Sequence, residues 1–186
     1  MGRLKGVRVA IVAGPEFEDI ELLYSYYRLL EEGAQVKVIA QERRAYSGKH
    51  GISVNADLTF SESDPAEFDA LFIPGGWMPD RVRRDRTATE WIRRFSELGR
   101  PIGVICHGGQ LLISAKAVRG YRMTAVSAIR DDLENAGALF VDAPVVRDRN
   151  VVSSRVPADL PHLMPEFIAL VEESAKRVRA AERGLK

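Results

Sequence analysis

The chain contains one cysteine, Cys106, at a position where a thiol can act as a nucleophile. An apolar run at residues 102–105 precedes it, and an apolar helical run at residues 111–118 follows it after His107 and two glycines. This pattern predicts a buried strand, an abrupt turn and a helix, with the thiol at the turn. The unpaired N–H groups and the dipole of a helix N-terminus favour the thiolate form. We therefore expect a catalytic or redox-sensing thiol, against the alternative that a lone cysteine is a small buried hydrophobe.

The neighbours of Cys106 favour the catalytic interpretation. The segment resembles a nucleophile elbow, with Gly108 as the small residue two positions after the nucleophile, although Val104 stands where that motif has glycine. His107 follows the cysteine directly, and a change of backbone direction there would let its imidazole approach the sulfur as a base or an ion-pair partner. The alternative for His107 is an ordinary packing or hydrogen-bonding role.

Two acidic residues are candidates to assist this pair. Asp80 follows the turn at residues 74–76 and can orient the imidazole of His107, or it can cap the helix that begins at Arg81. Glu18 opens the first helix, where acids commonly complement the helix dipole. The same turn should also project into the crevice that holds the thiol. A carboxylic acid buried there would have a raised pKa and could donate a hydrogen bond to the sulfur.

Glycines near the thiol are expected to bring the backbone close to it. Gly75 and Gly76 follow a proline at the end of an apolar run, which demands a sharp turn. We expect the N–H groups of Gly76 and His107 to form an oxyanion hole.

No cofactor or metal is expected. The three histidines lack zinc-ligand spacing, there is no second cysteine, and no P-loop or dinucleotide fingerprint occurs.

The elements that must position these groups alternate along the chain. Strands are predicted at residues 7–13, 35–40, 69–73, 102–106, 139–141, 145–147 and 151–153, with a β-excursion at 44–57. Helices are predicted at residues 18–33, 81–98, 110–118, 131–136 and 158–180. This alternation indicates an α/β sandwich, whose ligand crevice lies beyond the carboxyl ends of the strands. The loops at 14–18, 74–80 and 106–109 should therefore share one pocket.

Composition sets the broad class. The 186 residues carry a formal net charge of +1, with 46% hydrophobic and 28% charged residues. These values favour one globular domain over residues 1–186, with a core at about 7–172 and a frayed basic tail after about 177. No attraction to nucleic acid or to an anionic membrane is expected. The lone cysteine, the absence of a signal-peptide pattern and the lack of a long apolar run favour a cytoplasmic protein.

Several motifs together resemble one known family, the ThiJ/PfpI superfamily, and most closely its PfpI-like intracellular peptidase branch. They are Glu16-Phe-Glu-Asp-Ile-Glu-Leu22, Gly48-Lys-His-Gly51, Ile73-Pro-Gly-Gly76, Ile105-Cys-His-Gly108, Gln110-Leu-Leu-Ile-Ser-Ala115, Asp131-Asp132, Asn135-Ala-Gly137 and Ser153-Ser-Arg-Val-Pro-Ala-Asp159. The resemblance spans residues 7–172. It implies a flavodoxin-like three-layer sandwich, with a mostly parallel sheet and helices on both faces, related to class I glutamine amidotransferases.

The resemblance also implies roles for individual residues. Cys106 would be the nucleophile, His107 its base, and Glu18 the hydrogen-bond partner of the sulfur. An acid after the Pro-Gly-Gly turn would complete a triad across a subunit interface, so the chain would be a homo-oligomer, a dimer or a hexamer. Asp80 holds that position, where relatives usually carry glutamate. The pocket would be lined by Gly75, Trp77, Gly108 and Val126.

The implied function is that of a cysteine hydrolase. Its substrate would be a small molecule or a peptide or protein, cleaved by a peptidase, amidase or deglycase, in stress response or protein quality control. The alternative is a non-enzymatic oxidative-stress sensor or a chaperone, in which Cys106 is oxidised. Membership of such a superfamily fixes a site better than a substrate.

Overall fold

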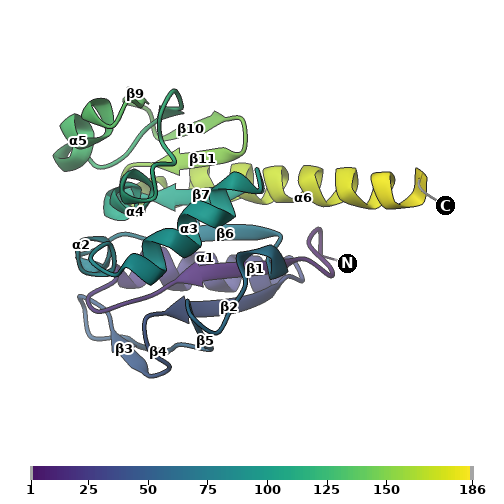
Figure 1. Ribbon diagram of the computed structural model, residues 1–186, viewed down its shortest axis with the longest axis horizontal. Coiled ribbons are helices and arrows are strands. Elements are labelled where there is room, and N and C mark those ends of the chain that lie inside the picture. The colour runs from purple at the N-terminus through teal and green to yellow at the C-terminus, as the bar shows by residue number, and fades with distance from the viewer. Residues whose placement is uncertain (1, 185–186) are drawn as a thin grey trace.

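A seven-stranded sheet forms the centre of the computed structural model, which describes residues 2–184 (Figure 1). The strand order is β10-β11-β7-β6-β1-β2-β5, and only the β10–β11 pair is antiparallel. The strands are β1 (Arg8–Val12), β2 (Gln35–Ala40), β5 (Leu58–Thr59), β6 (Ala70–Ile73), β7 (Ile102–Ile105), β10 (Val145–Asp148) and β11 (Val151–Ser154). The predicted mostly parallel sheet is therefore confirmed.

Helices cover both faces of this sheet, as Figure 1 shows. On one face α1 (Asp19–Glu31) packs against α6 (Leu160–Gly184). On the other, α4 (Gly109–Ser114) contacts α2 (Met78–Val82) and α3 (Arg86–Glu97). The result is the three-layer α/β sandwich that the alternation of elements predicts.

Shorter elements complete the chain. Two small sheets are formed by β3 (Ala45–Ser47) with β4 (Ser53–Asn55), and by β8 (Arg122–Met123) with β9 (Leu139–Phe140). The remaining helix is α5 (Arg130–Asn135), and the 3₁₀ turns are η1 (Pro65–Glu67), η2 (Cys106–Gly108), η3 (Ser127–Ile129) and η4 (Pro157–Asp159). The hairpin β3–β4 is the predicted β-excursion.

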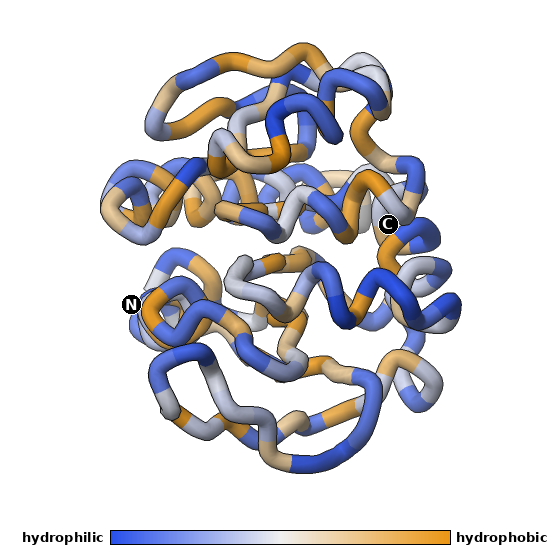
Figure 2. The backbone as a smooth tube through the Cα atoms, turned by 90° about the vertical axis from the view of Figure 1, so that its left-hand side faces the viewer, coloured by the Kyte–Doolittle hydropathy of each residue, from blue (hydrophilic) through white to orange (hydrophobic). Residues whose placement is uncertain are grey.

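The central strands form because their residues are apolar on both faces. All four residues of β6 and all four of β7 are buried, as is β1 from Val9 onward. Parallel strands covered by helices on both sides require such runs. The periphery, seen from the left-hand side of Figure 1, carries many hydrophilic stretches of the chain (Figure 2).

Three predicted helices differ clearly in extent from the structure. The helix expected at 110–118 ends at Ser114, as α4. The helix expected at 81–98 is two helices, α2 and α3, because the Asp85 carboxylate accepts a hydrogen bond from the Thr87 N–H at 2.8 Å and caps α3. The helix expected at 158–180 is longer at its C-terminal end, because α6 continues to Gly184. Arg179 Nη2 ties this extension to the Lys5 carbonyl at 2.7 Å.

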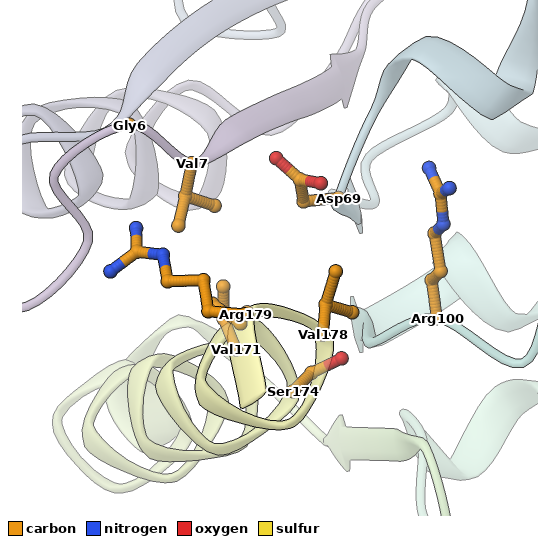
Figure 3. A pocket seen from close by; sticks show the side chains of 9 residues that line it. Gly6, Val7, Asp69, Arg100, Val171, Ser174, Val178 and Arg179 are labelled. Atoms are coloured by element: carbon orange, nitrogen blue, oxygen red, sulfur yellow. The ribbon is translucent and has the colours of Figure 1, made fainter. Parts of the chain in front are cut away.

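A cavity of about 210 Å³ lies between α6 and the amino ends of the central strands (Figure 3). Its polar groups hold neighbouring loops together. Asp69 Oδ2 accepts the Arg8 N–H at 2.8 Å, and Arg100 Nη1 donates to the Ala66 carbonyl at 2.8 Å. The candidate catalytic side chains, Cys106 and His107, lie at the opposite, carboxyl edge of the sheet. No helix within residues 2–184 is long and apolar enough to cross a membrane.

Candidate active site

Three loops meet at the carboxyl edge of the sheet, although residues 14–18 do not line the cavity beside His107 that the other two loops share. Phe17 and Gly76 form an isolated antiparallel bridge. The Glu18 N–H donates to the Gly75 carbonyl at 3.2 Å, and the Trp77 N–H donates to the Glu16 carbonyl at 2.9 Å. These bonds join the loop after β1 to the loop after β6. The Cys106 loop after β7 completes the group, because a Cβ atom added to Gly75 would lie 2.7 Å from the Cys106 Cβ.

Cys106 adopts the strained conformation of an elbow. Its φ is +60°, a region that residues with a side chain rarely occupy, and it lies between β7 and η2. The close packing leaves no alternative to glycine at position 75. There a Cβ would also lie 2.9 Å from the His107 nitrogen and 3.0 Å from Glu21 Oε2. Gly108 is equally constrained, with a would-be Cβ 2.7 Å from the Ile73 carbonyl oxygen.

The acid beside the thiol is Glu21, and the expectation that Glu18 holds this position is wrong. Glu21 is fully buried, and its Oε2 accepts the Gly75 N–H at 2.6 Å. Glu18 instead forms an ion pair with Lys49 Nζ at 3.0 Å, and its other oxygen lies 3.4 Å from His50 Nε2. The reason is helical phase: Glu18 holds the N-cap position of α1 without a side-chain cap and faces Lys49 and His50, whereas Glu21 lies on a buried face of α1.

Glu21 and Cys106 act electrostatically on one another. Burial raises the pKa of Glu21 to about 7, an effect opposed by the Gly75 N–H and increased by the Glu18 charge. Burial and then the Glu21 charge raise the pKa of the Cys106 thiol to about 12, while the backbone N–H groups of His107 and Gly76 lower it. Ionising both the Glu21 carboxyl and the Cys106 thiol in one buried site is unfavourable, so the two groups titrate as a coupled pair. The two amides expected to form an oxyanion hole thus point toward the sulfur.

His107 lies beside the thiol. Its Nδ1 is 3.4 Å from Cys106 Sγ, and its ring lies 5.9 Å from the Trp77 ring, centroid to centroid. Burial, and then the Lys49 charge, lower the pKa of this half-buried imidazole. A neutral imidazole near neutral pH can accept or deliver a proton.

Lys49 is a site residue that the sequence reasoning missed as a functional group. Its ammonium lies 5.7 Å from the centroid of the Trp77 ring and pairs with Glu18. Glu18 and, more weakly, the charges of Cys106 and Glu21 raise the Lys49 pKa. The glycine-flanked turn at 48–51 was a signal of close packing, but nothing local in it indicates which side chain reaches Glu18 and Trp77.

A cavity of about 490 Å³ opens beside His107. Its lining residues are Gly76, Trp77, Asp80, Arg81, Arg84, His107, Gln110, Ala128, Ile129 and Asp132. Trp77 is 55% exposed, so an indole face lies at the mouth. Of the residues predicted to line the pocket, Trp77 does so, and Gly76 lies beside it. Gly75 and Gly108, which were also predicted there, pack behind the elbow instead.

Asp80 and Val126 do not lie as the sequence interpretation placed them. Asp80 is neither a helix cap nor bonded to an imidazole of its own chain: it lies in the first turn of α2, where Arg84 Nη2 contacts its Oδ2 at 2.5 Å. Val126 lines a neighbouring cavity of about 300 Å³, together with Phe140 and Arg155. The 3₁₀ turn η3 lies between the two cavities. Its residues Ala128 and Ile129 line the cavity beside His107, whereas Val126 and Ser127 line the other.

One group among the described residues places potential metal ligands together. Atoms of Glu18, Asp19 and His50 lie within 4.8 Å of one another. Both Asp19 oxygens already accept backbone N–H groups, and Glu18 faces the Lys49 ammonium. The arrangement suits an ion pair and a loop anchor, and we assign no metal to it.

Comparisons with known proteins agree with this geometry. The sequence pattern of the DJ-1/PfpI family matches residues 7–170. A deglycase of Pyrococcus abyssi is 50% identical over 166 residues, which cover 89% of this chain and 100% of the relative. The deglycase PfpI of Pyrococcus furiosus is 47% identical over 166 residues, with the same two shares.

A solved structure shows the same fold. A two-domain protein of Anabaena variabilis, with DJ-1/ThiJ/PfpI-like and ferritin-like domains, superposes with a TM-score of 0.86 at 35% identity. The match covers 88% of this chain and 47% of that one. The predicted superfamily and flavodoxin-like sandwich are thus confirmed.

Proposed function

The chain belongs to the DJ-1/PfpI family, and from that premise we propose that it is a cysteine-dependent hydrolase acting as a deglycase. Its substrate would be an amine to which an α-dicarbonyl compound has added, on a protein or on a small molecule. The relatives named deglycases favour this substrate over an ordinary peptide bond. The corresponding role would be repair in stress response or protein quality control.

The observation that carries the proposal is the environment of one sulfur atom. Cys106 is held at φ +60°, with His107 Nδ1 3.4 Å from its Sγ and the amides of Gly76 and His107 toward it. Buried Glu21 lies on the other side. The groups that we propose as nucleophile, base, oxyanion donors and acid therefore lie around one point, beside a cavity open to solvent.

The chemistry can be written with this set of groups. The Cys106 thiolate would form a bond to the electrophilic carbon of the adduct as the C–N bond breaks. His107 would give a proton to the departing amine. The C–S bond of the resulting hemithioacetal would then break as the hydroxyl on the same carbon loses its proton and becomes a carbonyl, and the sulfur would regain a proton as the thiol. The freed carbonyl fragment would then take up water as its hydrate. The amides of Gly76 and His107 would stabilise negative charge developing on the substrate oxygen. No oxidant or cofactor is needed for this sequence.

The test follows release of free amine from a purified methylglyoxal adduct of N-acetyllysine. An excess of a dicarbonyl-trapping amine in every sample prevents simple consumption of free methylglyoxal from giving a signal. We expect Cys106→Ser to abolish release and His107→Asn to lower the rate by roughly 10²-fold or more. His162→Asn, at an exposed histidine of α6, is the matched control and should match the wild-type rate. Undiminished release by Cys106→Ser would refute the proposal.

Other outcomes would point to the alternatives. Cleavage of peptides that requires Cys106, without release from the adduct, would indicate a peptidase. Stoichiometric addition of two oxygen atoms to Cys106 after mild peroxide, with no turnover, would indicate an oxidative-stress sensor. Suppression of aggregation that survives Cys106→Ser would indicate a chaperone.

A further inference from the structure

We propose that the cavity between α6 and the amino ends of the central strands binds a small zwitterion, an α-amino acid with an apolar side chain. The cavity lies at the opposite edge of the sheet from Cys106, so this site is separate from the one proposed for deglycation. Its volume of about 210 Å³ is below the range typical of drug-sized ligands, which limits the occupant to a small molecule.

Two side chains of opposite charge line this cavity without pairing. Asp69 directly precedes β6 and Arg100 lies just before β7, and both are half-buried. The hydrogen-bond partners of both side chains are backbone groups, and no ion pair within residues 2–184 involves either one. A charge that is partly withdrawn from water is unfavourable without a counter-charge. A ligand that carries both an ammonium group and a carboxylate would compensate both charges.

Backbone contacts hold the two charged groups in place and leave atoms of each available to a ligand. Asp69 Oδ2 accepts the Arg8 N–H at 2.8 Å, and the Asp69 N–H donates to the Arg8 carbonyl at 2.8 Å. Arg100 Nη1 donates to the Ala66 carbonyl at 2.8 Å and to the Phe68 carbonyl. Oδ1 of Asp69 can therefore accept from an ammonium group, while Nε and Nη2 of Arg100 can donate to the two oxygens of a carboxylate.

The opposite wall of the cavity belongs to α6 and is largely apolar. Figure 3 shows Ser174 and Val178 of this helix across the cavity from Asp69 and Arg100. The apolar side chains of the lining are Val7, Val171, Ala175 and Val178. An aliphatic side chain placed against these methyl groups would leave water, which favours binding. The wall therefore selects an amino acid whose side chain is aliphatic.

Most of the lining lies outside the part of the chain that the family pattern matches. That match ends at residue 170, whereas Ser174, Val178 and Arg179 belong to later turns of α6. Beside the cavity, Arg179 Nη2 donates to the Lys5 carbonyl at 2.7 Å and joins α6 to the segment before β1. The site is thus built largely by residues that flank the matched range on both sides.

Isothermal titration calorimetry of the full chain with L-leucine tests this proposal. We expect saturable binding to the wild type, with one site per chain. Two analogues keep the carbon skeleton and remove one charge each: 4-methylpentanoate lacks the amino group, and 3-methylbutylamine lacks the carboxylate. Each should bind about 10-fold more weakly than leucine or worse, because each loses one charged hydrogen-bonding group.

Variants of the two charged residues test the same contacts from the protein side. Asp69→Asn and Arg100→Gln should each weaken leucine binding by about 10-fold or more. Asp57→Asn is the matched control for the first, because Asp57 makes the same two bonds with Val38, each at 2.8 Å, outside the cavity. Arg43→Gln, at an exposed arginine after β2, is the control for the second. Both controls should keep the wild-type affinity.

Three results would overturn the inference. One is the absence of leucine binding to the wild type at millimolar concentration. Another is an analogue that binds as tightly as leucine, and the third is a wild-type affinity in Asp69→Asn or Arg100→Gln. Circular dichroism verifies that each variant is folded, and the comparison of the three ligands on the wild type needs no variant. The titration requires no turnover at Cys106, so this proposal and the deglycase proposal fail separately.

Discussion

Glu21 and Cys106 lie in one buried site, and burial raises the free energy of ionising either side chain. The Glu21 carboxyl is fully buried, and only its Oε2 has a hydrogen-bond partner among the described residues, the Gly75 N–H. An acid in this environment favours its protonated form, and its proton can then serve the sulfur. Ionisation of Glu21 during folding is therefore penalised near neutral pH, which makes stability depend on pH.

We predict that replacing Glu21 by glutamine removes this pH dependence of the free energy of unfolding. The folded pKa of about 7 lies above the ordinary value of 4.5. The stability that the protonated acid provides is complete below about pH 4.5 and is lost as the pH rises through about 7. The free energy of unfolding of the wild type, relative to Glu21→Gln, should fall by about 3 kcal/mol across this window. Urea unfolding at several pH values measures it.

Glu67→Gln provides the control for that series. Glu67 is an exposed glutamate in η1, at the end of the molecule away from the thiol, so its replacement should leave the pH dependence of the wild type unchanged. A constant difference between wild type and Glu21→Gln at all pH values would contradict the assignment of a raised pKa to Glu21.

The turn after β6 and the elbow after β7 are fitted to each other. Gly75 has no side chain, and that absence provides the space for the Cβ of Cys106, the N–H of His107 and the carboxylate of Glu21. The elbow depends on a neighbouring loop as much as on its own sequence. Position 75 is therefore where a single methyl group should disturb the site most.

We predict that Gly75→Ala destabilises the protein by about 1–3 kcal/mol, because the added Cβ would lie 2.7 Å from the Cys106 Cβ. The alkylation rate of Cys106 should change together with the thermal midpoint. Gly109→Ala is the matched control: Gly109 has an ordinary helical φ of −54°, and its nearest would-be contact is the flexible end of Ile129 at 3.2 Å. Equal stability of Gly75→Ala and the wild type would show that the loops can separate freely.

Apolar side chains left exposed on α1 suggest how whole molecules associate. Ile20, Tyr24, Tyr27 and Leu30 recur with helical spacing on its outer side, and Tyr27 is 63% exposed. An apolar stripe of this kind on a globular protein commonly marks an interface. It accords with the homo-oligomer, a dimer or hexamer, that the family resemblance implies, in which Asp80 would approach His107 of a second copy.

We predict an oligomer whose mass is at least twice that of the 20.7 kDa chain, measured by light scattering after size exclusion. Tyr27→Glu should reduce it toward the monomer mass, because a buried unpaired charge opposes association. Leu98→Glu, at an exposed leucine after α3, is the control and should keep the oligomer. A wild-type chain that elutes as a monomer at micromolar concentration would contradict the prediction.

Local patterns were sufficient for most of the fold. Apolar runs marked the central strands, the periodic positions of α1 marked a helix, and the two glycines after Pro74 marked a close turn. Patterns failed where a short polar contact decided the outcome. Asp85 divided a predicted helix in two through one cap, and α6 extended beyond its predicted end. In the first case an apolar periodicity that runs across both helices hides a cap that involves only Asp85 and Thr87.

By itself, the sequence determined the position of the thiol, Cys106 at a turn with His107 beside it, since both follow from adjacent residues and from strand and helix periodicity. Only the tertiary structure decided which acid lies beside the sulfur and that Lys49 lies close to the same loops. Glu21 displaced Glu18 because the rotation of α1 against the sheet sets which carboxyl is buried. Lys49 entered the site because Asp19 anchors a turn some thirty residues away. Burial and long-range packing set such positions, and neither can be read from neighbouring residues.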